Sequence, residues 1–281
     1  SNVYLHDLVS AHISDACRDY FENQIGFVCV SVGRMVPPTP AELAEKNALA
    51  VCVEPYSKLP VDADGFRPVG CDYPPLKGLV PFAPFEFFIE QKLMMHNMGH
   101  AVTAYLGAWK GYEWICDASL DPEIKYFMTR ALTESARALS RKHGADLDAA
   151  LEFTDDLTVR FENRLLGDTV LRVGRDTKRK LAEHDRLVGA YNTAKAVGIV
   201  PAYIALGIAA GYLFEQKDDP TSLETSAFAK EKGIAAALEK YSNMTDAEDV
   251  KTISLFYDML SRKASFAELC GVLAELKYQE H

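Results

Sequence analysis

The segment KLMMHNMGH, residues 92–100, places four polar side chains in a stretch that otherwise has the apolar character of a buried helix. An α-helix turns by about 100° per residue, so relative to Lys92 the side chains of His96 and His100 lie at about 40° and 80°. Asn97 lies at about 140° on the same scale. All four groups therefore project over one side of the helix, and this polar stripe has three interpretations.

The first interpretation is a solvated helix face, and the second is a metal site. A solvated face would carry Glu, Lys and Arg, whereas this one combines His, Asn and Gly with three Met. The i,i+4 spacing of His96 and His100 lets two imidazoles bind one zinc ion, as in a metal hydrolase. The sequence HNMGH lacks the glutamate of a metalloprotease helix, and beyond Asp117 or a more distant carboxylate no third ligand is marked.

The third interpretation is acid/base chemistry on a small substrate. Desolvation and nearby positive charge lower the pKa of a lysine, so Lys92 could act as a general base near neutral pH. Asn97 could donate an amide hydrogen to an oxygen that gains negative charge, and His100 could bind and orient the same oxygen. Gly99 would leave space for the substrate to approach the helix.

A basic segment, LRVGRDTKRKL at residues 171–181, stands out in a chain with a formal net charge of -10. We interpret Lys178 and Lys180 as solvated. Arg175 follows a glycine that permits a tight turn, and an arginine displayed there can bind a phosphate through two hydrogen bonds. Arg179 is the second candidate. The segment therefore predicts a phosphate-binding site for a sugar or polyol phosphate.

The elements that must position these residues are mainly helical. Alternating or continuous apolar runs predict two strands at 27–34 and 48–56, and the Pro- and Gly-rich residues 57–84 predict a long loop. Apolar periodicity predicts helices at 3–22, 85–107, 121–144, 147–166, 181–197, 201–216, 221–239 and 246–262. We therefore expect a junction region over residues 1–84 and a multi-helix bundle over residues 85–281.

The amino-acid composition disfavours some classes of binding partner. The chain of 281 residues has a sequence pI of about 5.2, which disfavours nucleic acid and anionic lipid as partners. Six cysteines without a CxxC pair favour free thiols in a reducing, cytoplasmic compartment. The uncharged stretch 196–214 contains Gly198 and Pro201, which leave about fourteen helical residues, too few to span a membrane. We expect a buried core helix there.

Several segments together resemble the polyol-specific long-chain dehydrogenases, most of all the mannitol-1-phosphate 5-dehydrogenases. The pattern E-x-K-L-x-x-H-N-M-G-H-A-x-x-A-Y-L-G at residues 90–107 contains the motif K-x4-N-x2-H, which is fairly specific. GFVCVSVGRMVPP at 26–38, the arginine-rich residues 160–189, GIAAGYLF at 207–214 and DDP at 218–220 extend the resemblance to about residue 240.

The resemblance implies a helical fold of the 6-phosphogluconate dehydrogenase C-terminal type and oxidation of a secondary alcohol with NAD and without a metal. It implies that Lys92 is the general base and that Asn97 and His100 bind and polarise the reacting oxygen. His96 receives no chemical role. The segment that contains Arg175 and Arg179 would contact the substrate.

In that family a dinucleotide-binding domain precedes this region, and it would bind NAD and supply a further oxyanion-binding asparagine. The chain has no GxGxxG or GxxxxGK[ST] motif, so we assign it no cofactor-binding residue. Alone it is expected to be inactive, not to bind NADH, and to self-associate through the exposed edges of its strands.

Three functions remain open at this point. The favoured one is the catalytic half of an enzyme that interconverts mannitol 1-phosphate and fructose 6-phosphate, with free mannitol or a hexuronate as related substrates. The second is a non-enzymatic sugar-phosphate-binding or dimerising module, which would use Arg175 and gain nothing from Lys92. The third is a metal hydrolase that uses His96 and His100.

Overall fold

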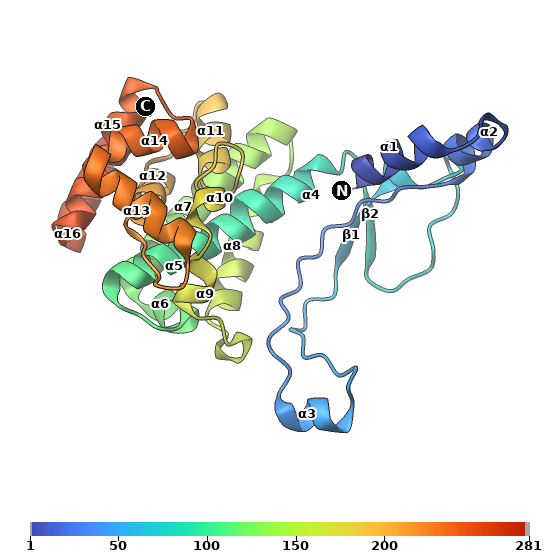
Figure 1. Cartoon of the computed structure of the whole chain (residues 1–281), viewed down its shortest axis with the longest axis horizontal. Coiled ribbons are helices and arrows are strands. Elements are labelled where there is room, and N and C mark those ends of the chain that lie inside the picture. The colour runs from blue at the N-terminus through green and yellow to red at the C-terminus, as the bar shows by residue number, and fades with distance from the viewer. Residues whose placement is uncertain (1, 279–281) are drawn as a thin grey trace. The chain divides into compact units, whose positions relative to one another are not determined.

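The computed structural model describes residues 2–278, and the chain divides into two compact units, residues 1–92 and 93–281 (Figure 1). This division falls inside the long helix that carries Lys92. The elements of the first unit are α1 Asn2–His12, α2 Asp15–Gln24, α3 Ala41–Lys46, β1 Leu59–Asp62, β2 Leu79–Phe82 and α4 Glu86–Gln91.

The strands of the first unit lie elsewhere than the sequence predicts. β1 and β2 pair in parallel, with Leu59 opposite Leu79. The prediction of strands at 27–34 and 48–56 is wrong, because only an isolated bridge between Val30 and Val61 forms there. These β-branched runs have strand propensity, but a strand also needs a neighbour to pair with. The helix predicted at 3–22 is interrupted between α1 and α2.

The second unit is a bundle of helices, which confirms the predicted mainly helical fold. A six-residue π-helical segment, Lys92–Asn97, leads into it from α4. Its helices are α5 Met98–Lys110, α6 Ile115–Leu120, α7 Pro122–His143, α8 Leu147–Phe161, α9 Val170–Gly174, α10 Thr177–Lys180, α11 Val188–Ala196, α12 Ala202–Leu213, α13 Pro220–Lys232, α14 Ile234–Ser242, α15 Ala247–Ser261 and α16 Phe266–Tyr278.

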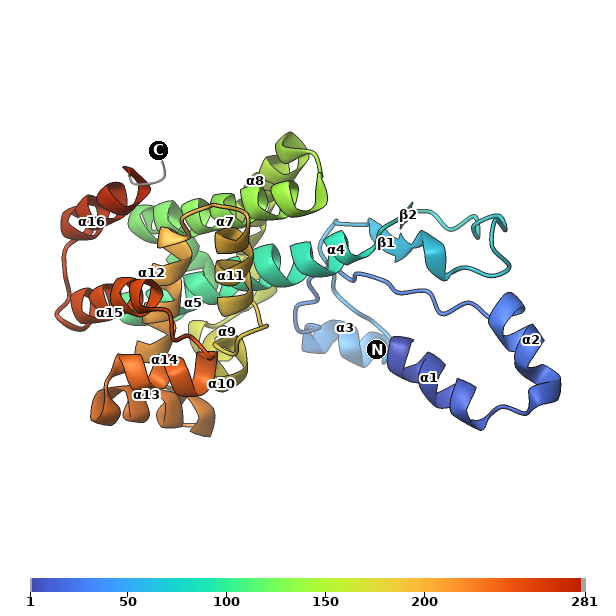
Figure 2. The same cartoon turned by 90° about the horizontal axis from the view of Figure 1, so that it is seen from above.

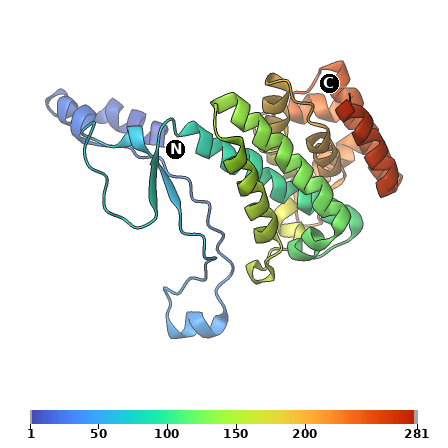
Figure 3. The ribbon, with the colours of Figure 1, turned by 180° about the vertical axis from the view of Figure 1, so that it is seen from behind.

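The boundaries of α7 match local signals in the sequence. Asp121 caps the helix by accepting hydrogen bonds from the backbone N–H groups of Glu123 and Ile124, both 3.0 Å long, and Pro122 occupies the first turn. Gly144 ends the helix with a φ of 63°, in the left-handed region that favours glycine. α7 packs along α8, and the two form the green pair in Figure 3. Together they make one wall of the bundle.

The uncharged stretch forms the buried centre of the unit. α12 packs between α5 and α15, and every residue from Ala202 to Tyr212 is buried (Figure 2). A Cβ atom on Gly207 would lie 2.6 Å from Cγ2 of Val102, so this glycine allows α5 to approach closely. The expectation of a buried core helix is confirmed. None of the helices in residues 2–278 is both long and apolar enough to cross a membrane.

Other helix boundaries differ from the predicted ones. The helix predicted at 147–166 ends at Phe161, and the one at 181–197 begins only at Val188. Gly233, with a φ of 87°, divides the helix predicted at 221–239 into α13 and α14. α16 was not predicted. The sequence nevertheless contains a signal for its start, because Ser265 and Glu268 form a capping box in which each side chain accepts a hydrogen bond from the backbone N–H group of the other residue.

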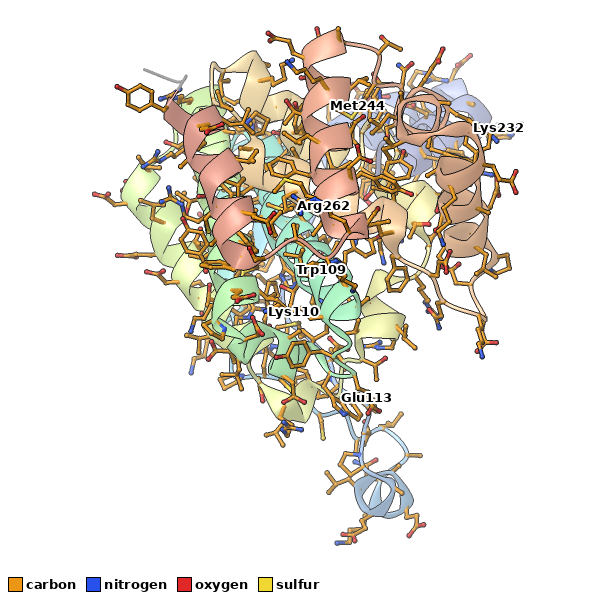
Figure 4. The ribbon with its side chains drawn as sticks, turned by 90° about the vertical axis from the view of Figure 1, so that its left-hand side faces the viewer. Trp109, Lys110, Glu113, Lys232, Met244 and Arg262 are labelled. Carbon is orange, nitrogen blue, oxygen red and sulfur yellow. The ribbon has the colours of Figure 1, made fainter. Side chains whose placement is uncertain are left out.

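The end of α5 is anchored on the end of α15. Trp109 donates a 2.8 Å hydrogen bond from Nε1 to the carbonyl oxygen of Leu260. The ammonium group of Lys263 lies 5.0 Å from the centre of the Trp109 ring, where a cation is attracted to the aromatic face. Figure 4 shows Trp109 beside the loop that begins at Arg262. This contact fixes the far end of the helix whose first turn carries His100.

Candidate active site

The helix that carries the polar stripe is not a regular α-helix. Lys92 is the first residue and Asn97 the last residue of the π-helical segment. A π-helix closes hydrogen bonds between residues i and i+5, so Asn97 lies about one turn after Lys92 and near the same face. The regular helix assumed from the sequence separates them more widely. His100 follows Asn97 by three residues in α-helical geometry, which makes the two side chains neighbours.

A contact from α7 supports the π-helical segment. Ser135 donates a 2.7 Å hydrogen bond from its hydroxyl to the carbonyl oxygen of Met94, and both groups are buried. Met94 and Met95 also bury their side chains against the bundle. Single π-helical turns inside α-helices often occur at functional sites. This turn could not be predicted from the local sequence, because Ser135 lies on a distant helix.

Burial changes the electrostatics of Lys92. Its side chain is half-buried, and burial lowers its pKa from the ordinary value of a lysine. Desolvation is the cause, because it disfavours the charged ammonium form. Nearby positive charge, the other cause that we expected, makes no resolved contribution.

The ring of His100 is held in a fixed plane. It stacks on the ring of Phe161 with the centroids 4.9 Å apart and 10° between the planes. Burial lowers the pKa of His100 well below its usual range, and the positive charges of His96, Lys180 and Arg172 add to this effect. The imidazole is therefore neutral near pH 7. Its Nε2 atom lies 3.5 Å from Oδ2 of Asp168.

His96 and Gly99 have packing contacts. The His96 side chain is buried, and its ring lies 5.8 Å from that of Phe161 and 6.3 Å from that of His100. In the part of the chain that the structure describes, no three His, Cys, Asp or Glu residues gather as a metal site would require. A Cβ atom on Gly99 would lie 2.8 Å from Leu132, so helix packing requires this glycine. Substrate access is not needed to explain it.

The structure separates the two predicted phosphate-binding arginines by their partners. Arg175 is exposed, and within residues 2–278 its guanidinium group makes no ion pair or hydrogen bond. Arg179 is already paired, with Nε 2.5 Å from Asp176 and NH1 3.5 Å from Asp185. Gly174 packs against Phe214, whose ring would lie 2.5 Å from an added Cβ atom. The guanidinium group of Arg175 is therefore more available to bind an anion than that of Arg179.

The interpretation of Lys180 as a solvated residue is wrong. Its side chain is 6% exposed, and its ammonium group donates hydrogen bonds to the carbonyl oxygens of Val173 and Arg175. Burial, together with the charges of Arg186 and Arg179, lowers its pKa to about 8. Lys178, in contrast, is exposed and forms an ion pair with Glu224, 3.0 Å away. Two lysines in one short segment thus have opposite environments.

Sequence reasoning missed Asp168 and Arg172, which form an ion pair beside His100. The two residues are four positions apart, with Asp168 directly before the N-cap residue Thr169 and Arg172 inside α9. That spacing was a signal in the sequence. The contact of Asp168 with His100 could not be predicted from the sequence, because α5 and α9 are far apart in the chain.

Comparisons with known proteins show the family and the fold of this chain. Residues 85–268 match the family described as the mannitol dehydrogenase C-terminal domain. Two solved structures have a similar fold. A Pseudomonas fluorescens mannitol 2-dehydrogenase in ternary complex with NAD and D-mannitol has a TM-score of 0.69 at 22% identity, over 97% of this chain. A substrate-free D-sorbitol dehydrogenase has a TM-score of 0.75 at 21% identity, over 92% of this chain.

This chain spans 57% of the length of each of those two structures. At these identities the likeness shows the fold, whereas the family match covers more than half of the chain and includes the segment with Lys92, Asn97 and His100. The resemblance to the polyol dehydrogenases is thereby confirmed. Residues 85–268 form a mannitol dehydrogenase C-terminal domain, and the chain belongs to the mannitol dehydrogenase family.

Proposed function

We propose that this chain forms the substrate-binding and catalytic part of an NAD-dependent polyol dehydrogenase. The observation that carries the proposal is the π-helical segment, because it brings Lys92 and Asn97 to one helix face, next to His100. A base, an amide donor and a neutral imidazole on one face can together hold and deprotonate an alcohol. The family match supports the same activity.

In the proposed reaction Lys92, as a neutral amine, accepts the proton of the reacting hydroxyl group. The lowered pKa of Lys92 makes this form more accessible near neutral pH. Asn97 donates its amide hydrogen to the same oxygen, where negative charge develops as the proton leaves. A bound nicotinamide would supply the hydride acceptor.

The described residues do not offer the usual binding site for a dinucleotide. Such a site places a glycine-rich turn between a strand and a helix, so that backbone N–H groups contact the pyrophosphate. Here β2 leads into α4 through Ala83, Pro84 and Phe85, without a glycine. We therefore assign the NAD contacts to the dinucleotide-binding domain of the family and derive only the proton and oxygen steps from this chain.

We further propose mannitol 1-phosphate and fructose 6-phosphate as the substrate pair. The support is the exposed guanidinium group of Arg175, which is available for an anion and lies in the same segment as the buried Lys180. Free mannitol or a hexuronate is the alternative within the family. D-mannitol is bound in one of the similar structures.

A substrate comparison tests the proposal. An enzyme that contains these residues together with a dinucleotide-binding domain of the family should reduce NAD with mannitol 1-phosphate more efficiently than with mannitol or sorbitol. A preference for free mannitol would contradict the proposed phosphorylated substrate but would agree with the proposed polyol dehydrogenase activity. Binding of the sugar phosphate without any turnover would favour a non-enzymatic module.

A chelator tests the alternative metal hydrolase. If Lys92 is the base and Asn97 polarises the oxygen, EDTA should leave the rate of NAD reduction unchanged. Stoichiometric zinc in the purified protein, lost together with activity on chelation, would instead favour a site that uses His96 and His100.

A further inference from the structure

The two nitrogen atoms of His100 have different environments. Nε2 is shielded from solvent and makes no hydrogen bond to the described residues, and Oδ2 of Asp168 lies 3.5 Å from it. The side chain as a whole keeps 17% of its surface exposed. Since Nε2 takes no part in that exposure, Nδ1 is the polar ring atom that remains for a ligand.

The backbone around Asp168 is held in place by hydrogen bonds on both sides. The N–H group of Ile115 donates a 2.9 Å hydrogen bond to the carbonyl oxygen of Asp168, and the N–H group of Val170 donates a 2.8 Å bond to Glu113. Thr169 caps α9 by accepting a hydrogen bond from the N–H group of Arg172. This short antiparallel pairing fixes Asp168 at a point where its side chain is only 9% exposed.

The effect of Asp168 on the protonation of His100 depends on the charges around the carboxylate. An isolated carboxylate beside a histidine favours the imidazolium form. Here the guanidinium group of Arg172 pairs with Asp168 and compensates its charge. Burial and the positive charges of His96, Lys180 and Arg172 keep the pKa of His100 low, so the ring is neutral and carries one hydrogen. The position of that hydrogen then determines which nitrogen can accept a hydrogen bond.

We propose that Asp168 is a positioning residue: its carboxylate accepts the hydrogen of His100 Nε2 and leaves Nδ1 as the acceptor for a substrate hydroxyl group. The opposite tautomer would place the lone pair of Nε2 against a carboxylate oxygen 3.5 Å away, which is repulsive. The separation is longer than a typical hydrogen bond, and such contacts tighten when the substrate binds. The stacking on Phe161 holds the plane of the ring.

This inference rests on the proposed function and refines the role of His100 in it. A hydroxyl group has one hydrogen, and in the proposed reaction that hydrogen of the reacting alcohol goes to Lys92. An unprotonated Nδ1 must therefore accept its hydrogen bond from another hydroxyl group of the same polyol. His100 then recognises a neighbouring hydroxyl, and Asn97 is the neutral donor to the reacting oxygen.

The tautomer can be observed directly in the chain. Long-range ¹H–¹⁵N spectra of the ¹⁵N-labelled protein distinguish a protonated from an unprotonated ring nitrogen, and His100→Asn assigns the signals. At pH 7 we expect a protonated Nε2 and an unprotonated Nδ1 for His100. An Nδ1–H tautomer in the unsubstituted protein overturns the inference, and this result requires no variant to fold.

Two variants test whether Asp168 determines the tautomer of His100. Asp168→Asn can donate as well as accept, so the pure Nε2–H pattern should be lost, whereas Asp168→Glu should retain it. The matched control is Asp117→Asn, which also removes the carboxylate of an aspartate–arginine ion pair, with Arg164, that does not contact His100. An unchanged His100 pattern in folded Asp168→Asn, judged by the signals of the other histidines, rejects the role of Asp168.

The test also separates this inference from the proposed function. A protein without polyol-dependent NAD reduction can still show the Nε2–H tautomer, and then only the function fails. An active enzyme with the Nδ1–H tautomer would support the proposed function and contradict the proposed role of Asp168.

Discussion

Lys92 and Asn97 are the first and last residues of one π-helical segment, and this relationship places the proposed base and the proposed amide donor on one helix face. A regular α-helix would turn Asn97 by about 140° from Lys92. The hydrogen bond from Ser135 of α7 to the carbonyl oxygen of Met94 supports this segment.

The first prediction concerns Asn97. Asn97→Ala should lower turnover by roughly 10²–10³-fold, because removal of one donor to a developing oxyanion has an effect of that size. Initial rates of NAD reduction measure it. Gln91→Ala, which removes an amide side chain from the same helix, is the control and should remain close to the parent enzyme. Equal losses in the two variants would mean that the helix, and not the amide, is responsible.

The second prediction concerns the two arginines. Arg175→Ala should raise KM for mannitol 1-phosphate about tenfold or more and change the KM for mannitol little, since a charged hydrogen bond contributes roughly 1.5–3 kcal/mol. Arg179→Ala should have a smaller effect on KM, because its guanidinium group already pairs with Asp176 and Asp185. Lys178→Ala serves as a control for the loss of one positive charge. If Arg175→Ala weakens both substrates equally, Arg175 lies outside the phosphate site.

The third prediction concerns pH and Glu134. This buried carboxylate accepts hydrogen bonds from the N–H groups of Tyr203 and Ile204 and lies 3.4 Å from Lys277. Burial nevertheless raises its pKa to about 7. The folded-state pKa exceeds the unfolded one, so the stability contributed by the protonated form is complete below about pH 4.3 and is lost as the pH rises through 7.

The variant Glu134→Gln tests this contribution. Gln cannot ionise, so the free energy of unfolding of the parent, relative to the variant, should fall between pH 5 and pH 8 by an amount on the order of 3 kcal/mol. Urea unfolding at the two pH values measures it. Glu152→Gln, a change at an exposed glutamate, should show no such trend. A difference that is independent of pH would mean that Glu134 is ionised throughout.

The fourth prediction concerns the cofactor. NADH titrated into the chain of 281 residues should give no saturable change in fluorescence or heat, because the described strands lack a glycine-rich turn into a helix. Saturable micromolar binding would show that these residues contain a cofactor site, and the assignment of NAD contacts to another domain would be wrong.

Features that depend on residues close in sequence could be predicted, whereas features that depend on residues far apart in the chain could not. The boundaries of α7 were predictable because Asp121, Pro122 and Gly144 act on their own neighbours. The strands were not, because pairing joins segments far apart in the chain, such as Leu59 and Leu79. Propensity in the runs at 27–34 and 48–56 could not supply a partner.

The site shows the same limit. The residue types and the spacing of Lys92, Asn97 and His100 were visible in the sequence, but the π-helical turn depends on packing against another helix. The burial of Lys180 depends on the carbonyl groups of the loop around it, which composition does not reveal. The contact of Asp168 with His100 joins two segments that only the fold brings together.

The most direct test of the account is the rate of polyol-dependent NAD reduction by Lys92→Ala. In an enzyme that joins these residues to a dinucleotide-binding domain of the family, loss of the general base should lower turnover by roughly 10²–10⁴-fold. NADH binding should be unchanged, and an added primary amine should restore part of the rate. Turnover within a few-fold of the parent enzyme, at the same pH and with saturating substrate, would contradict the assignment of Lys92 as the base.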